Sequence, residues 1–237
     1  MTDSFEFTLD GVDITARPGQ TILAAADEAG VYIPRLCAHP DLVPHGSCRV
    51  CTVRVNGRPQ AACTQPAAPG LIVESETEEL RDIRKGILEM LFVEGNHVCP
   101  FCERSGDCEL QALGYRYGVA APRFPFLFPK REVDATHPDI LIDHNRCVLC
   151  GRCVRASRDI DGKHVFDFVG RGIHKRIAVN AEAKLGGTNI DLSDKVVEVC
   201  PVGAILKKRQ AYRVPIGERS YDVKPIGSKI EQPSTAD

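Results

Sequence analysis

The chain has 237 residues, of which 43% are hydrophobic and 26% charged, and its formal net charge is -2 at pH 7. These values are typical of a folded chain of one to three small domains. They exclude a general attraction to nucleic acid, and the absence of an apolar run of roughly 18 residues excludes direct insertion into a membrane. The unusual feature is eleven cysteines. Because MTDSFEFTLDGVDI lacks the basic and apolar parts of an export signal, we expect a cytoplasmic protein whose clustered cysteines bind metal.

The first segment, residues 1–77, is predicted to form a small α+β domain of the β-grasp type. The alternating stretch FEFTLDGVDITA is broken by Asp10-Gly11, a dipeptide that favours a tight hairpin turn. A short helix is expected over residues 21–28. CRVCTVRVNGRPQAAC carries an Asn-Gly turn, and a further strand is expected over residues 70–75.

The second segment, residues 78–122, is predicted to be short and helical. Its apolar residues recur at helical spacing, which indicates an amphipathic helix: Leu80, Ile83, Ile87, Met90 and Leu91. Ser75 and Glu78 have the spacing of a capping box at the start of this helix. CELQALGYRYG indicates a second helix, and RFPFLFPKR indicates an extended linker, residues 123–137, that is strapped to a surface.

The third segment, residues 138–212, contains the strand-like stretches ILID, VFDFVG and KRIAVN, and residues 213–237 form a polar tail. Residues 140–176 contain eight Lys or Arg against four Asp. These basic residues either stabilise reduced metal clusters, pair with acidic partners, or form an ordinary solvated face.

The third cysteine group predicts a cubane iron-sulfur site. Bacterial ferredoxins continue the run C-x2-C-x2-C with x3-C-P, whose cysteine serves a second cluster. Here that position holds Ser157. Cys200-Pro201 resembles the end of a second run of the same kind. At the other three ligand positions of this second run, the cysteines are replaced by Ile190, Ser193 and Val196. We predict one 4Fe-4S cluster in a bacterial-ferredoxin-like domain, with zinc or free thiols as alternatives. Its ligands are Cys147, Cys150, Cys153 and Cys200.

The first cysteine group predicts a 2Fe-2S site. Its spacing, C-x10-C-x2-C-x11-C, shares the central pair of plant-type ferredoxins, and a β-grasp sheet leaves one long loop free to wrap a flat cluster. The predicted ligands are Cys37, Cys48, Cys51 and Cys63. A Rieske site would use His39 and His45, which we interpret as ordinary loop residues because four cysteines are available. A zinc ribbon is the alternative.

The middle group, C-x2-C-x5-C, provides only three thiols: Cys99, Cys102 and Cys108. The nearby candidates for a fourth ligand of a 4Fe-4S cluster are His97, Glu103 and Asp107. We predict His97, since imidazole binds iron well and this residue lies on the same loop. A water-ligated or carboxylate-ligated cluster is the alternative.

These three motifs, in the order C-x10-C-x2-C-x11-C, NHVCPFCERSGDCELQ and C-x2-C-x2-C followed by CPVGAI, resemble the N-terminal iron-sulfur region of the complex I 75 kDa subunit. The chain is more similar to the diaphorase small subunit of cytoplasmic NAD-reducing nickel-iron hydrogenases, because of EGNHVCPFCERSGDCELQALGY, SRDIDGKHVF and PIGERSYD. One departure is that complex I members usually place histidine at the position of Gly95, whereas this chain has His97. The shortened spacing is similar to that of the hydrogenase subgroup.

The resemblance implies one 2Fe-2S and two 4Fe-4S clusters that use all eleven cysteines and His97. It implies an electron-transfer subunit of a hydrogen:NAD+ oxidoreductase that works with a flavin/NAD-binding diaphorase large subunit and with hydrogenase small and large subunits. The sequence has no G-x-G-x-x-G motif after a strand and no P-loop, so we expect FMN, NAD and the nickel-iron centre on partner subunits only, and no catalytic residue on this chain. The alternatives are a relay subunit of complex I or of a formate dehydrogenase, and a zinc-stabilised binding protein.

Overall fold

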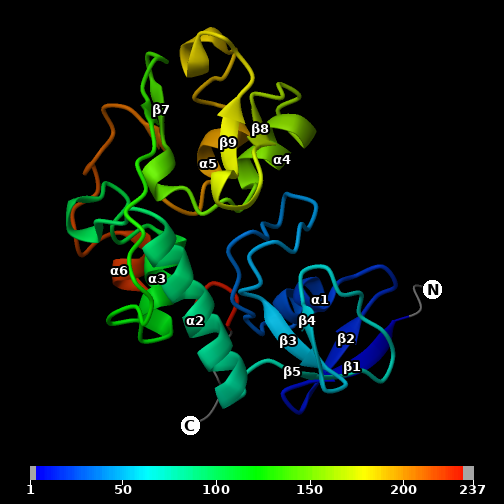
Figure 1. Ribbon diagram of the computed structural model, residues 1–237. Helices are drawn as coiled ribbons and strands as arrows, with labels where there is room; N and C mark the ends of the chain where they lie inside the picture. Colours follow the sequence, from blue (N-terminus) through cyan, green and yellow to red (C-terminus); the bar gives the residue numbers. More distant parts are fainter. Residues whose placement is uncertain (1–3, 232–237) are drawn as a thin grey trace.

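The computed structural model describes residues 4–231, and its first unit is a five-stranded sheet packed against one helix (Figure 1). The first three residues of the predicted domain lie outside the described part. The strand order is β2-β1-β5-β3-β4, in which β1 and β5 are parallel and the other neighbours antiparallel. The elements are β1 (Phe5–Leu9), β2 (Val12–Ala16), α1 (Ile22–Glu28), β3 (Thr52–Val55), β4 (Arg58–Ala61) and β5 (Ile72–Glu74). This is the predicted α+β arrangement of a β-grasp domain.

Both predicted hairpins of the first unit are confirmed. Asp10 and Gly11 have φ values of 50 and 81°, and Asn56 and Gly57 have values of 47 and 79°, as a two-residue hairpin turn requires. The helix α1 begins after Thr21, whose side chain accepts a hydrogen bond from the Ala24 backbone N–H (3.2 Å). The core between α1 and the sheet is mostly aliphatic, with Phe7 as its buried aromatic residue.

The second unit consists of α2 (Glu78–Glu94), the 3-10 turn η1 (Cys99–Phe101) and α3 (Glu109–Arg116). The predicted capping box is wrong. Thr77 caps α2 by accepting from the Leu80 N–H (3.2 Å), while Ser75 is buried and its hydroxyl accepts from Arg84 (2.9 Å). The predicted apolar face also differs, because Ile83 and Met90 are exposed and α2 buries Arg84 on the side that faces the first unit.

Residues 123–131 form the predicted extended strap along α2. The Leu127 N–H donates to the Val93 carbonyl (3.0 Å), and the Asn96 side chain donates to the Pro129 carbonyl (2.7 Å). Arg123 anchors the start of the strap, since its Nε donates to the buried Glu89 carboxylate (2.7 Å). The strap ends in a short strand that joins the third unit.

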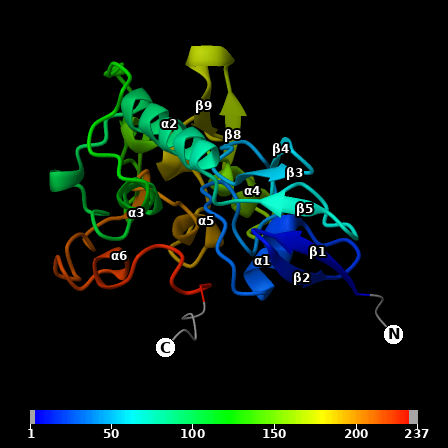
Figure 2. The ribbon, with the colours of Figure 1, turned by 90° about the horizontal axis from the view of Figure 1, so that it is seen from below.

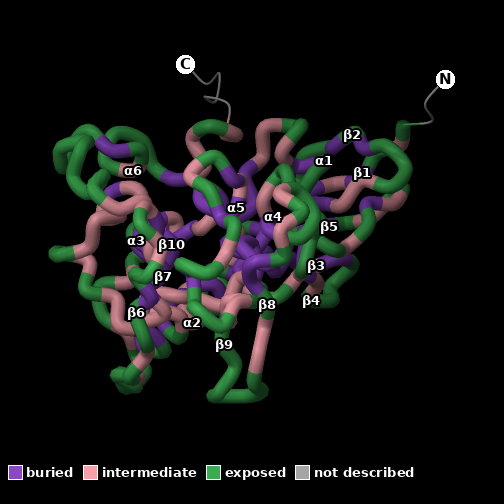
Figure 3. The backbone as a smooth tube through the Cα atoms, turned by 90° about the horizontal axis from the view of Figure 1, so that it is seen from above, coloured by how far each residue is buried: buried purple, intermediate pink, exposed green. Residues whose placement is uncertain are grey.

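The third unit contains a three-stranded sheet of order β10-β7-β6, a separate β8-β9 hairpin and two short helices. Its elements are β6 (Val133–Asp134), β7 (Ile140–Asp143), η2 (His144–Arg146), α4 (Arg152–Asp159), β8 (Phe166–Val169), η3 (Gly172–His174), β9 (Arg176–Val179), η4 (Lys184–Gly187), α5 (Lys195–Glu198) and β10 (Ile205–Lys207). Figure 3 shows buried chain where the units meet and an exposed β8-β9 tip.

The polar C-terminal segment is folded against the second unit, and interpreting it as a simple tail is wrong for its described part. It includes α6 (Ser220–Val223), seen beside α3 in Figures 1 and 2. Ile226 is buried in a cluster with Leu110 and Leu113, and Arg116 pairs with Glu231. Residues 232–237 lie outside the described part. Among residues 4–231, no helix is both long and apolar enough to cross a membrane.

Candidate metal centres

The first cysteine group lies at the end of the β-grasp sheet that faces the third unit. Cys51 directly precedes β3, Cys63 follows β4, and Cys37 and Cys48 lie on the long loop between α1 and β3. In Figure 1 this blue loop rises from the sheet towards α4. The Cys37 N–H donates to the Cys48 sulfur (3.3 Å). The structure therefore brings together all four residues that the spacing predicted.

The four thiols of this group are linked by hydrogen bonds. Hydrogen bonds from Cys48 and Cys63 lower the pKa of Cys37, and the hydrogen bond from Cys63 lowers the pKa of Cys51 to about 7. The same bonds raise the pKa values of Cys48 and Cys63. Bound iron would replace these protons, since metals bind the thiolate form. The donor set fits a 2Fe-2S cluster.

The two histidines near this group have other contacts. His39 Nδ1 accepts a hydrogen bond from the Asp41 N–H (3.2 Å), and the His45 ring stacks on Phe168 with its centroid at 6.3 Å. Their positions agree with the interpretation of both as loop residues.

The middle group lines one cavity beside the N-terminus of α3. His97, Cys99, Cys102 and Cys108 all face it, together with Phe92 and Leu110. His97 Nε2 is buried and has no hydrogen-bond partner. Burial, assisted by Arg131 and Arg146, lowers the pKa of His97 to about 4, so the imidazole is neutral and can donate a lone pair to iron. An unpartnered buried nitrogen in a thiol-lined cavity fits the predicted fourth ligand.

The two carboxylates considered as ligands are paired elsewhere. Glu103 accepts from Arg146, and Asp107 pairs with Arg104 at 3.3 Å. Position 95 has no room for a side chain: a Cβ on Gly95 would lie 2.7 Å from His97 Nε2 and 2.8 Å from the Asn145 carbonyl oxygen. The His97 ring therefore occupies the space that a side chain at position 95 would need, and glycine is required there.

The third group lines a second cavity. Cys147, Cys150, Cys153 and Cys200 face it together with Ile142, Ile177 and Val202. Burial raises the pKa of Cys147 to about 11 and that of Cys150 to about 12, and it also raises the pKa of Cys153 well above its usual value. A bound cluster would supply the positive charge that ionises such thiols. Within residues 4–231 no three His, Cys, Asp or Glu side chains converge on the position of a single ion. The thiols of this group instead surround a cavity, as ligands of a multi-iron cluster do.

The positions that would carry the ligands of a second cluster hold side chains with other roles. Ser157 is fully buried, and its hydroxyl accepts from the Val165 N–H (2.7 Å). Ile190 and Val196 are buried in the apolar core of the third unit, whereas Ser193 is exposed. Cys200 reaches the site because β10 pairs with β7, which carries the chain back beside the start of the C-x2-C-x2-C run.

The eight basic residues of 140–176 separate into three classes. Arg146 and Lys163 are half-buried and pair with carboxylates, Arg146 with Glu103 and Lys163 with Asp194. Arg158, Arg171, Lys175 and Arg176 are exposed, as the interpretation of a solvated face expects. Arg152 and Arg155 are buried and join units. Arg152 donates to the Ala38 carbonyl of the first unit (2.8 Å) and to Glu109 of the second (2.7 Å). The sequence carried no signal for these contacts, because their partners lie more than 40 positions away.

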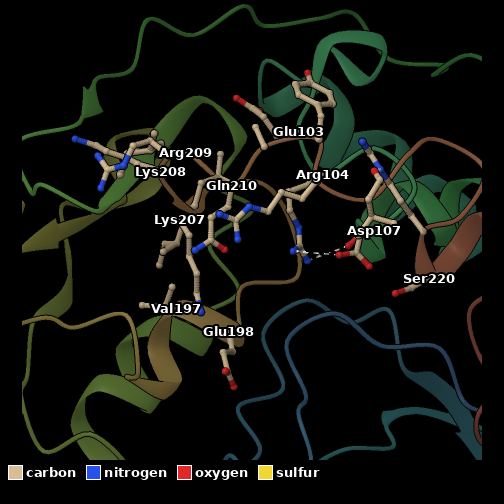
Figure 4. A pocket seen from close by; sticks show the side chains of 18 of the residues that line it. Glu103, Arg104, Asp107, Val197, Glu198, Lys207, Lys208, Arg209, Gln210 and Ser220 are labelled. Atoms are coloured by element: carbon tan, nitrogen blue, oxygen red, sulfur yellow. Dashed lines mark hydrogen bonds and ion pairs between the residues drawn. The ribbon is translucent and has the colours of Figure 1, made fainter.

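A wide groove of about 740 Å³ lies beside the middle group (Figure 4). It runs between the loop that carries Glu103, Arg104 and Asp107 and the strand end at 207–210, and both charge signs line it. No predicted cluster ligand lines this groove.

Three family descriptions match successive parts of the chain. Residues 2–78 match a 2Fe-2S iron-sulfur cluster binding domain, residues 84–123 match the NADH-ubiquinone oxidoreductase-G iron-sulfur binding region, and residues 137–206 match the ferredoxin-like domain of NADH-quinone oxidoreductase subunit 3. The chain therefore contains both 2Fe-2S and 4Fe-4S binding domains.

Similar proteins agree with these descriptions. The NAD-reducing hydrogenase HoxS subunit gamma of Cupriavidus necator is 43% identical over 95% of this chain and 97% of its own length. The mitochondrial NADH-ubiquinone oxidoreductase 78 kDa subunit of Candida albicans is 37% identical over 88% of this chain, which spans 29% of that protein. A chain in the crystal structure of an NAD+-reducing [NiFe]-hydrogenase in the H2-reduced state is 50% identical, with a TM-score of 0.91 over 94% of this chain and 95% of that one. The chain thus belongs to the family of iron-sulfur subunits that includes the HoxS gamma subunit and the homologous region of the complex I 78 kDa subunit.

Proposed function

We propose that this chain is the electron-relay subunit of an NAD-reducing hydrogenase. Such an enzyme transfers electrons from H2 to NAD+ and produces NADH and a proton. The observation that carries the proposal is that all twelve predicted ligands lie in three groups of four. The similarity to the HoxS gamma subunit over nearly the whole of both chains favours this complex over other NAD-linked ones.

The cofactors in this proposal are one 2Fe-2S and two 4Fe-4S clusters. Cys37, Cys48, Cys51 and Cys63 hold the first; His97, Cys99, Cys102 and Cys108 hold the second; Cys147, Cys150, Cys153 and Cys200 hold the third. When bound, such clusters accept and release single electrons. The chain holds the ligands in fixed positions, shields them from water and surrounds them with charge that sets their potentials.

The partners are a flavin/NAD-binding diaphorase large subunit and hydrogenase small and large subunits, in the cytoplasm. FMN, NAD and the nickel-iron centre lie on those partners. The cluster-bearing domains are assigned to residues 1–77, 78–122 and 138–212, joined by the linker 123–137 and followed by 213–237. The end of the linker contributes β6 to the sheet of the third domain.

Metal content tests the proposal against its rivals. The anaerobically purified chain is expected to be brown and to contain about ten iron atoms, with acid-labile sulfide. A colourless protein that contains zinc would refute it in favour of a zinc-stabilised protein. Anaerobic co-purification followed by identification of the bound subunits separates hydrogenase from complex I or formate dehydrogenase, because the relay is defined by its neighbours.

Replacing His97 by cysteine tests the histidine ligand. We expect His97→Cys to retain a 4Fe-4S cluster in the middle site and to lower its midpoint potential, because a thiolate adds a negative charge where imidazole is neutral. Redox titration followed by electron paramagnetic resonance measures the potential. The control is Asp107→Asn, which removes a rejected ligand and should leave the cluster in place. An unchanged potential in His97→Cys would show that His97 does not bind iron.

A further inference from the structure

Arg155 is a buried cation at the junction of the first and third units. It lies on α4, two positions after Cys153, and is 5% exposed. Its guanidinium donates to three backbone carbonyls: Cys37 (2.6 Å), Val43 (2.6 Å) and Gly151 (3.2 Å). One side chain therefore connects a predicted ligand of the first site to the helix that carries a ligand of the third.

These contacts give each guanidinium nitrogen of Arg155 one hydrogen-bond acceptor, but they do not neutralise its charge. A buried charge is costly unless an opposite charge lies nearby. The other buried arginines show how this chain meets that need: Arg84 pairs with Glu76 at 3.1 Å, and Arg152 pairs with Glu109 at 2.7 Å. Arg219 lies beside the Tyr212 ring on the wall of the wide groove, where water has access. Among residues 4–231, Arg155 makes no ion pair and does not line that groove. Asp159, four positions further along α4, is the nearby carboxylate, but it pairs with Arg158 instead.

Iron-sulfur clusters with four thiolate ligands carry net negative charge, and reduction adds one more. We propose that Arg155 is the counter-cation shared by the first and third clusters, positioned by the Cys37, Val43 and Gly151 carbonyls so that it stabilises the reduced form of both. This inference rests on the ligand assignment proposed above. A role as counter-cation explains why a charged side chain is buried here. A neutral donor could make the same hydrogen bonds to the three carbonyls.

The test is the midpoint potential of each cluster in the full-length chain, purified without oxygen together with its partner subunits. In Arg155→Gln we expect the first and third clusters to be harder to reduce, with a change on the order of tenfold in the one-electron equilibrium, which corresponds to about 59 mV. The middle cluster should keep its potential. Arg155→Lys keeps the charge but loses the planar fork of donors. In this variant both clusters should keep the midpoint potentials of the wild type. Arg158→Gln, which removes an exposed cation from the same helix, should change neither.

The outcomes distinguish an electrostatic role of Arg155 from a purely structural one. Intact clusters with unchanged potentials in Arg155→Gln overturn the inference, as does a Lys variant whose potentials fall as far as those of the Gln variant. If Arg155→Gln loses its clusters, retention of both clusters at wild-type potentials in Arg155→Lys supports the inference, and loss in both variants overturns it. A wild-type chain without iron and sulfide would instead refute the cluster assignment itself.

Discussion

Replacing Cys200 by serine is expected to remove the C-terminal 4Fe-4S cluster and to leave the other two in place. Cys200 lines the same cavity as Cys147, Cys150 and Cys153, and a serine hydroxyl is a poor substitute for a thiolate on iron. Iron content should fall from about ten to about six atoms per chain. Electron paramagnetic resonance of the reduced protein should lose one 4Fe-4S signal only.

The matched control for this experiment is Cys63→Ser, which should abolish the 2Fe-2S signal and spare both 4Fe-4S signals. Cys63 is buried within the first group and hydrogen-bonds to Cys37 and Cys51. Loss of the 2Fe-2S signal in Cys200→Ser would show that the cysteines are grouped wrongly. The pair of variants therefore tests the long-range assignment in both directions.

Replacing Arg84 by methionine is expected to lower the free energy of unfolding by roughly 2–4 kcal/mol, because it weakens the junction between the first and second units. Arg84 is fully buried on α2. It donates to the Thr52 carbonyl at the start of β3 (2.9 Å) and to the Ser75 carbonyl after β5 (2.7 Å). Methionine fills the space of the aliphatic stem but leaves these buried acceptors without a donor. With a slope of about 2 kcal/mol/M, typical of small proteins in urea, the unfolding midpoint should fall by about 1–2 M.

Arg81 provides the matched control for the charge. It lies on the same helix and pairs with the same carboxylate, Glu76, at 2.9 Å, but its side chain is 51% exposed. Exposed ion pairs contribute about 0–1 kcal/mol, so Arg81→Met should leave the urea midpoint nearly unchanged. Equal effects of the two substitutions would mean that the ion pair, and not the buried hydrogen bonds, joins the units.

The elements that were predicted correctly are those with local causes. The Asp10-Gly11 and Asn56-Gly57 turns form because these residues tolerate positive φ, and α1 begins at a threonine whose own side chain caps it. The start of α2 was predicted wrongly for a tertiary reason. Ser75 has the spacing of a cap, but Arg84 takes its hydroxyl, and Thr77 caps the helix instead.

The sequence by itself indicated the three cysteine groups, because tight spacings such as C-x2-C place thiols together on one loop wherever that loop lies. Cys200 is the exception, since it joins its group only through the pairing of β10 with β7. The sequence also indicated His97, which shares a loop with its cysteines. Only the tertiary structure decided which arginines are buried, that Gly95 makes room for His97, and that the polar C-terminal segment packs on α3. These features depend on contacts between residues far apart in the chain. Such contacts form when whole units pack together, and a local pattern does not record them.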